Sequence, residues 1–431
     1  MAAFVSAGAP VAVVAALRAH ASSPAVVESA CRAIRNVASF GVGAAACVSA
    51  GAPAAVVAGL RAHAFSPAVA EQACAAIRNM AHDSSEGQAA CISAGAPAAV
   101  VAALTAHASS PAVAKQACWA ILDVAEDSEG LAACVSAGAP AAVVAALRAK
   151  ASSPAVVEHA CLAIAQLSMH SEGGKAACVS AGAPAAVVAA LRVRASSPAV
   201  AERACAAICN MVMGSSECQA ACVSAGAPAA VLAALTVHAS SPAVAEQACA
   251  AIRNMASGSS EGRAACVSAG APAAVMAALR AHASSPVVVE SACQAIANLS
   301  RDSEVGMAAC VSVGAPTVVV AGLRAHASSP AVLETACLAI RNVASSSVGA
   351  AACVSTGAPA AVVAALRAQA SSPAVAEQAC WAIRNMAMGS EGRAACASAG
   401  AVGAVVAAQA QHPTVASVAA ACVVALAALR Q

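Results

Sequence analysis

The stretch SAGAP, Ser268 to Pro272, decides the fold, because it returns with small changes along the whole chain. Its glycine stands at positions 8, 51, 95, 138, 182, 226, 270, 314, 357 and 400. The interval is therefore 43 or 44 residues, and a proline preceded by Ser, or once by His, recurs in each interval. Such self-similarity is typical of repeat proteins, so about ten repeats fill the 431 residues.

One repeat, residues 241–286, shows why the motif predicts helices. Ser241 is a suitable N-cap, and Pro242 suits the first helical position, where its missing N–H costs nothing. An apolar stripe at helical spacing follows, formed by Val244, Ala248, Ile252 and Met255. Gly258 ends this helix, a short helix runs to the SAGAP glycine, and Pro272 opens a longer one. Each repeat therefore predicts three helices and no strand.

A single repeat of this kind cannot bury its stripe, so neighbouring repeats must stack into one continuous core. The stretches "GAPAAVVAAL" and "PAVAEQACWAIRNMA", the latter Pro373 to Ala387, resemble the armadillo repeat family, although the proline lies nearer the glycine and one loop is longer. The resemblance implies an all-α, right-handed superhelix: a single armadillo-repeat solenoid, 1–431, of about ten repeats. We expect the first repeat to lack a full first helix and the last repeat, 397–431, to be atypical.

The third helix of each repeat carries the residues that the family uses for binding. There a Trp and an Asn line a concave groove and hold an extended peptide, and Trp381 with Asn385 resembles that pair, as does Trp119 with Asp123. The twelfth position after the proline forms a column of Asn36, Asn79, Asp123, Gln166, Asn210, Asn254, Asn298, Asn342 and Asn385. A primary amide offers a donor and an acceptor to a peptide unit. Two interpretations stand: the column grips a peptide, or duplication copied it unused.

An arginine precedes the amide in five repeats, at Arg35, Arg78, Arg253, Arg341 and Arg384. Arginine forms bidentate pairs with carboxylates, so these side chains would favour an acidic peptide. The alternative is that they face solvent and pair with the glutamates at the fourth position of the same helices. For the two Trp, the alternative to a ligand contact is that they only cover the helix surface.

Cysteine and histidine also follow the repeat. Most of the 21 cysteines fall at two core positions, where we expect small buried hydrophobes; Cys209 and Cys218 lie outside both series and are candidates for exposed thiols. Six histidines share one loop position and predict a solvated rim. Neither pattern offers a metal site.

Composition excludes several classes of function. The net charge of +2, from 22 basic and 20 acidic residues, gives no electrostatic footprint for nucleic acid. Apolar residues make up 61% of the chain, yet glycine, proline and polar residues interrupt every run long enough to span a membrane. The N-terminus is a poor signal peptide, which favours a cytoplasmic or nuclear location. No catalytic constellation or cofactor motif occurs, so the sequence predicts no enzyme and no cofactor.

These observations predict a non-catalytic scaffold that binds an extended peptide of a protein partner through the amide column. Two alternatives remain open: a nuclear transport receptor similar to importin alpha, and a structural rod in a cytoskeletal assembly. The apolar ends of the solenoid also predict self-association.

Overall fold

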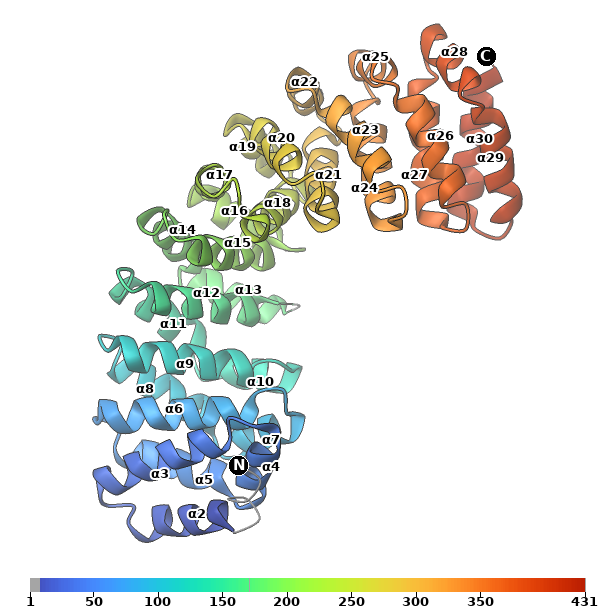
Figure 1. Ribbon diagram of the computed structural model, residues 1–431. Helices are drawn as coiled ribbons and strands as arrows, with labels where there is room; N and C mark the ends of the chain where they lie inside the picture. The colour runs from blue at the N-terminus through green and yellow to red at the C-terminus, as the bar shows by residue number, and fades with distance from the viewer. Residues whose placement is uncertain (1–7, 170, 431) are drawn as a thin grey trace. The chain divides into compact units, whose positions relative to one another are not determined.

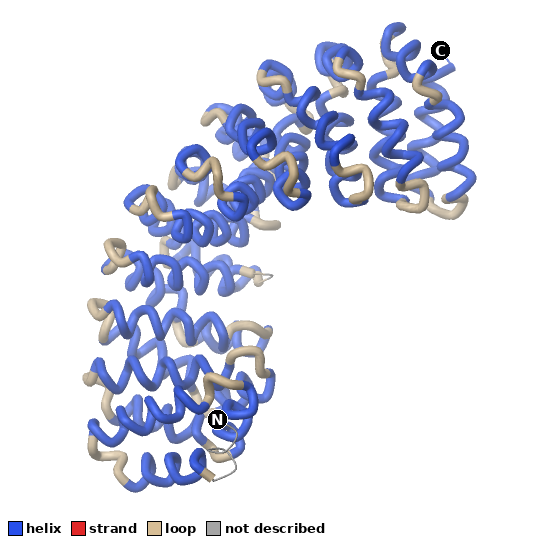
Figure 2. Tube along the Cα trace, viewed as in Figure 1, coloured by secondary structure: helices blue, strands red, loops and turns tan. Residues whose placement is uncertain are grey.

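The computed structural model describes residues 8–169 and 171–430 (Figure 1), and every regular element among them is a helix (Figure 2). Packing divides the chain into two compact units, Met1–Met211 and Val212–Gln431. The all-α repeat fold is therefore confirmed, whereas a single solenoid over residues 1–431 stays a prediction. The expected incomplete helix of the first repeat falls within 1–7, outside the described residues.

The helices are of three kinds, which alternate along the chain. The short first helices are α4 (Gly41–Ser49), α7 (Ser85–Ser93), α10 (Ser128–Ser136), α13 (Glu172–Ser180), α16 (Ser216–Ser224), α19 (Ser260–Ser268), α22 (Glu304–Ser312), α25 (Ser347–Ser355) and α28 (Ser390–Ser398). The second helices are α2 (Ala9–Ala19), α5 (Ala52–Ala62), α8 (Ala96–Ala106), α11 (Ala139–Ala149), α14 (Ala183–Val193), α17 (Ala227–Val237), α20 (Ala271–Ala281), α23 (Ala315–Ala325), α26 (Ala358–Ala368) and α29 (Ala401–Gln411). The third helices are α3 (Pro24–Val37), α6 (Pro67–Ala81), α9 (Pro111–Val124), α12 (Pro154–Ser168), α15 (Pro198–Val212), α18 (Pro242–Ser257), α21 (Pro286–Ser300), α24 (Pro330–Val343), α27 (Pro373–Met386) and α30 (Ala416–Arg430).

The SAGAP glycine turns the chain between the first and second helices. Gly51, for example, has a φ of 77°, a left-handed conformation that L side chains rarely adopt, and its N–H bonds to the carbonyl of Val48. The third helix begins as predicted, with Ser241 as the N-cap of α18 and Pro242 at its first position. The local chemistry of two short motifs thus sets the boundaries of every repeat.

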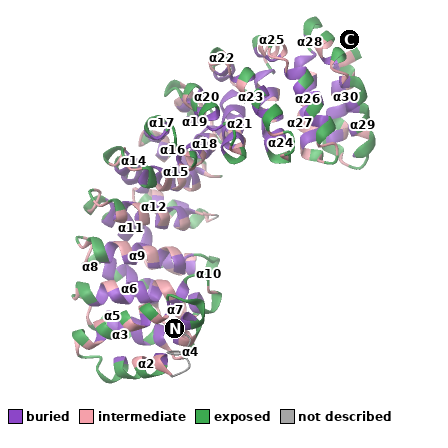
Figure 3. Ribbon diagram, in the orientation of Figure 1, coloured by how far each residue is buried: buried purple, intermediate pink, exposed green. Residues whose placement is uncertain are grey.

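The third helices pack on one another in chain order, α3 to α6 to α9 to α12 in the first unit and α18 to α21 to α24 to α27 to α30 in the second. Buried residues follow these contacts, and exposed residues gather at the helix ends (Figure 3). All 21 cysteines are buried, as predicted for the two regular series, and none of them forms a disulfide in the part of the chain that the structure describes. The expectation of exposed thiols is wrong for Cys209 and Cys218, which are 7% and 1% exposed.

The loop histidines tie consecutive repeats together, which corrects the expectation of a merely solvated rim. Each bond joins the ring Nε2 to a backbone carbonyl of the preceding repeat: His107 contacts Ala64 O at 2.9 Å, and His282 contacts Ala239 O at the same distance. Arg194 replaces histidine in one repeat and donates to the equivalent carbonyl, that of Ala151. The position therefore requires an N–H donor that can reach the neighbouring loop, which a periodicity argument alone does not reveal.

Candidate functional site

One side of the third helices from α3 to α27 carries most of their polar residues, and we call it the third-helix face. It consists of the fourth, fifth, eighth, eleventh and twelfth residues after the helix proline, which share a side because their spacing follows the helical period. Most of these side chains are half-buried. All predicted site residues of the sequence lie on this face, in columns that run from repeat to repeat within each unit.

The amide column bonds to the scaffold itself. Asn79 Nδ2 donates to Arg35 O at 2.8 Å, and Gln166 and Asn210 make the corresponding bonds in the first unit. In the second unit Asn385 Nδ2 donates to Arg341 O at 2.8 Å. Asn298 and Asn342 follow the same pattern, at 3.0 and 2.8 Å. These six amides thus tie their helices to the end of the preceding repeat's third helix, which gives the column a structural role that needs no ligand.

The amides nevertheless keep bonding capacity for a ligand. An Asn side chain has two N–H donors and a carbonyl acceptor, and the bond to the preceding repeat uses only one donor. The Oδ1 atoms of Asn79 and Asn385 accept from the adjacent Arg78 and Arg384, whereas no bond to Asn342 Oδ1 is found among the described residues. Asn342 therefore keeps its carbonyl acceptor for a ligand, and Asn36 keeps its full bonding capacity, since no side-chain hydrogen bond of Asn36 is found among the described residues.

The arginines of the eleventh position lie along the face and do not pair with the glutamates of the fourth position in the described ion pairs. Arg35 Nη1 donates to Gln72 Oε1 of the next repeat at 3.0 Å, and Arg341 Nη1 makes the same bond to Gln378 at 2.9 Å. Arg253 reaches Gln294 likewise. Much of the donor capacity of the arginines is thus used between repeats.

Each Trp of the eighth position lies beneath an arginine of the preceding repeat. The Arg78 Cζ is 4.1 Å from the Trp119 ring centroid, and the Arg341 Cζ is 5.2 Å from that of Trp381. Such contacts between a guanidinium and an aromatic face are attractive. His159 also packs against Trp119, with ring centroids 4.6 Å apart. The contacts within the protein account for both Trp positions.

Asp123, the acid of the amide column, is 7% exposed. Its Oδ2 has no hydrogen-bond partner by strict geometry and lies 3.4 Å from Nδ1 of the exposed His82. Burial raises the pKa of Asp123 from 3.8 to about 6, and the nearby His82 and Arg78 oppose the rise. Asp123 thus places a carboxyl where the other repeats have an amide, and burial of this carboxyl disfavours its charged form.

A row of glutamates on the face was not selected from the sequence. A glutamate stands at the fourth position after the helix proline in every third helix from α3 to α27 except α9, which has Lys115 there. In the second unit Glu334 lies in this row between Glu290 and Glu377. Its pKa is raised by burial first, and then by the negative charges of those two neighbours. Their regular recurrence was the available signal, and the row carries like charges close enough to repel.

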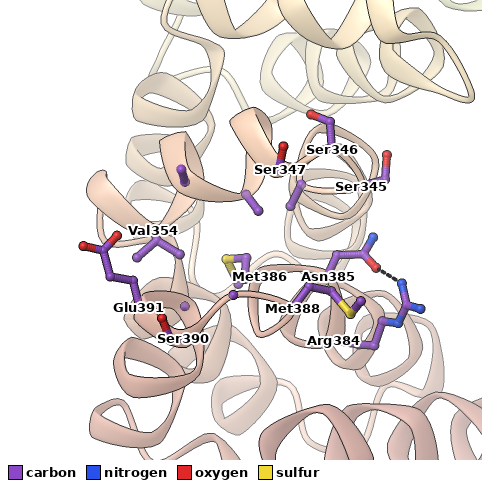
Figure 4. A pocket seen from close by; sticks show the side chains of 15 residues that line it. Ser345, Ser346, Ser347, Val354, Arg384, Asn385, Met386, Met388, Ser390 and Glu391 are labelled. Carbon is purple, nitrogen blue, oxygen red and sulfur yellow. Dashed lines mark hydrogen bonds between the residues drawn. The ribbon is translucent and has the colours of Figure 1, made fainter. Parts of the chain in front are cut away.

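A cavity of about 640 Å³ lies between α25 and α28 of the second unit, beside the end of the amide column (Figure 4). Its lining includes Arg384 and Asn385 of the face, the apolar Met386 and Met388, and Glu391 at the end opposite Arg384.

Within the described residues no group of three or more His, Cys, Asp or Glu side chains could hold a metal ion. No described helix is by itself long and apolar enough to cross a membrane, although nine sharply bent helix pairs meet that test together.

Several known proteins resemble this chain. The family model described as LRRK2 ARM repeat matches residues 176–347. An engineered protein of known structure has a TM-score of 0.86 and 25% identity, covering 98% of this chain and 99% of its own. A designed armadillo repeat protein in complex with the peptide (KR)4 has a TM-score of 0.50 and 29% identity, over 57% of this chain and 98% of that one.

A further structure, concerned with a phosphorylation switch in the interaction between cadherin and beta-catenin, has a TM-score of 0.77. It is 16% identical and covers 99% of this chain and 84% of that one, a likeness that shows the fold alone. None of the curated proteins matches the chain. The class of protein is thus an α-solenoid of three-helix repeats. The comparisons confirm the resemblance to armadillo repeats seen in the sequence.

Proposed function

We propose that this protein is a non-catalytic interaction scaffold that binds an extended, basic peptide segment of a protein partner along the third-helix face. The observation that carries the proposal is the row of Glu290, Glu334 and Glu377 beside the amide column. Burial first, and then the negative charges of the other two glutamates, raise the pKa of Glu334, and cationic side chains would relieve the repulsion among the three. The amides would hold the peptide backbone through their remaining donors and acceptors.

The designed relative in complex with (KR)4 supports this choice, because it is a protein of the same repeat type with a basic peptide. The acidic peptide predicted from the arginine column is the weaker proposal, because Arg78 and Arg341 already bond to Asn79, Gln116 and Gln378. The column still carries positive charge, so the two ligands must be compared directly.

The test is a titration of two labelled peptides, (KR)4 and an alternating Asp-Glu peptide of equal length, followed by fluorescence anisotropy at low salt. We expect (KR)4 to bind and the acidic peptide not to. Changing Glu290, Glu334 and Glu377 together to Gln should weaken (KR)4 binding by about tenfold or more, since exposed charges each contribute a fraction of a kcal/mol to 1 kcal/mol.

The matched control removes the same charge from the same unit but off the face, by changing Glu217, Glu261 and Glu304 together to Gln. These residues lie in the first turns of α16, α19 and α22. The control should bind nearly as well as the parent. Equal weakening by both triple variants would reduce the effect to net charge, and preferential binding of the acidic peptide would favour the arginine column instead.

The glutamate row also favours a second candidate, a nuclear transport receptor for basic signal segments. It predicts that a reporter fused to (KR)4 accumulates in nuclei of permeabilised cells only when the chain is added. We further propose a cytoplasmic or nuclear location, which is supported by the buried cysteines that form no disulfide among the described residues, since disulfides are rare in those compartments.

A further inference from the structure

The fourth residue of the first helix varies in a way that the repeat pattern does not explain. It carries a long side chain in seven repeats and alanine in two. The nine residues are Ala44, Gln88, Leu131, Lys175, Gln219, Arg263, Met307, Ala350 and Arg393. In eight of these helices a glycine precedes the position and packs closely on the end of the previous third helix, and in α16 the buried Cys218 precedes it, so the position lies at the seam between repeats.

In two repeats of the second unit the long side chain crosses the seam to the same place. Gln219 Nε2 donates to the carbonyl of Asn254, and Arg263 Nε donates to the carbonyl of Asn298, both at 3.0 Å and both across 35 residues. That carbonyl belongs to the amide-column residue near the end of the next third helix. Carbonyls at a helix end lack intrahelical partners, and the negative end of the helix dipole favours a cation there.

Ala350 is too short to make this bond. Its counterpart 35 residues on is Asn385, the last member of the amide column, and the place that a long side chain fills elsewhere is the cavity of about 640 Å³. Figure 4 shows the side chains of Met386 and Met388 in the middle of this cavity, with Arg384 at one end and Glu391 at the other. The guanidinium of Arg384 is held by Asn385 Oδ1 at 2.9 Å.

Arg263 is a template within the same chain for what the cavity lacks. An acid opens the following first helix in both places, as the first residue of α22 at Glu304 after Arg263 and as the second residue of α28 at Glu391 after Ala350. A group that replaces the missing side chain needs an apolar stem to cover the methionines, N–H donors for the Asn385 carbonyl and a positive charge toward Glu391.

We propose that the cavity between α25 and α28 binds an arginine side chain of the partner peptide, in the manner in which Arg263 fills the equivalent seam. The source of that side chain rests on the proposed function, because the cavity opens beside the amide column that the basic peptide would follow. The ligand thereby supplies a seam contact that the protein supplies for itself through Gln219 and Arg263.

The probe is Nα-acetyl-arginine amide, and its comparison compound is the citrulline analogue, which has the same length without the charge. Binding is measured on the full chain by isothermal titration and by NMR of methionine methyl groups. We expect saturable binding of the arginine probe with shifts at Met386 and Met388, and about tenfold weaker binding of the citrulline probe, because charge-assisted hydrogen bonds are roughly twice as strong as neutral ones.

Two substitutions test the place of binding. Ala350→Arg should fill the cavity with the side chain used at Arg263, raise the melting temperature and abolish probe binding. Arg263→Ala should open the equivalent seam and add a second site for the probe. Ala308→Arg is the control, because it adds an arginine on the exposed surface of α22, and it should leave binding unchanged.

Equal binding of the citrulline probe, or undiminished binding to a folded Ala350→Arg variant, would overturn the proposal. Its failure is distinguishable from failure of the proposed function, because the small probe contacts the third-helix face only at Arg384 and Asn385 and does not need the glutamate row. A chain changed to Gln at Glu290, Glu334 and Glu377 should lose (KR)4 and still bind the probe. Loss of probe binding in that variant would also contradict a separate site.

Discussion

Arg78 lies over the ring of Trp119 from the next repeat, with its Cζ 4.1 Å from the ring centroid. The same guanidinium bonds to Asn79 Oδ1 and Gln116 Oε1, so one side chain joins three columns of the third-helix face. Trp119 therefore contributes to the contact between repeats in the absence of any ligand.

Replacing Trp119 with Leu should lower the free energy of unfolding by about 1 to 2 kcal/mol, from lost ring contact and burial. The matched change Trp381→Leu should cost less, because Arg341 is farther from its ring at 5.2 Å. Urea denaturation followed by circular dichroism measures both. An equal loss in the two variants would show that the guanidinium contact does not contribute.

Asn385→Ala should lower the free energy of unfolding by about 1 to 2 kcal/mol, because it leaves the carbonyl of Arg341 without its donor. Asn36→Ala is the comparison, since no side-chain hydrogen bond of Asn36 is found among the described residues, and it should cost less. Chemical denaturation of both variants gives the difference. If Asn385→Ala were as stable as the parent, the amide column would not be part of the scaffold.

Gly87→Ala should destabilise the protein by several kcal/mol, about the cost of a backbone shift in a packed interior. A Cβ built at Gly87 would lie 1.8 Å from the carbonyl oxygen of Met80, which no side chain can tolerate. Gly173→Ala in α13 is the control, because nothing lies within 4 Å of its Cβ. That change should raise the melting temperature slightly, as alanine favours a helix.

Asp123→Asn should stabilise the protein at neutral pH and have little effect near pH 4. Burial raises the folded-state pKa of Asp123 from 3.8 to about 6, so between these values the folded state binds more protons than the unfolded state. The parent therefore loses stability as the pH rises through that window. The amide cannot ionise, so the gain should reach the order of 1 to 3 kcal/mol at pH 8.

Melting temperatures of the parent and Asp123→Asn measured from pH 4 to pH 8 test this expectation. A difference that stays constant with pH would mean that the substitution acts through packing or hydrogen bonding. His82→Ala on its own should then show how far the neighbouring imidazole offsets the desolvation of the carboxyl.

The repeat, its three helices and the columns of the third helix were predictable, because they depend on local chemistry at Ser241, Pro242 and Gly270 and on the helical period. The contacts across repeats were not. Whether Arg341 meets a glutamate of its own helix or Gln378 of the next depends on the distance between packed helices, which no single repeat encodes.

The cavity beside Ala350 shows the same limit. The sequence shows that alanine replaces a long residue at this position. It does not show that the long residue bonds to a carbonyl 35 residues away, as Arg263 does to Asn298. The amide column was recognisable as a set, but its bonds to preceding carbonyls, such as that of Asn79 to Arg35, require the stacked structure.

The bonds from each amide to the preceding helix also have a mechanical consequence. Asn298 and Asn342 each anchor their helix to the one before, and few contacts bypass a neighbour. Under tension applied along a unit, these bonds would load in series, and extension should proceed as separate force peaks, each releasing one repeat of 43 or 44 residues.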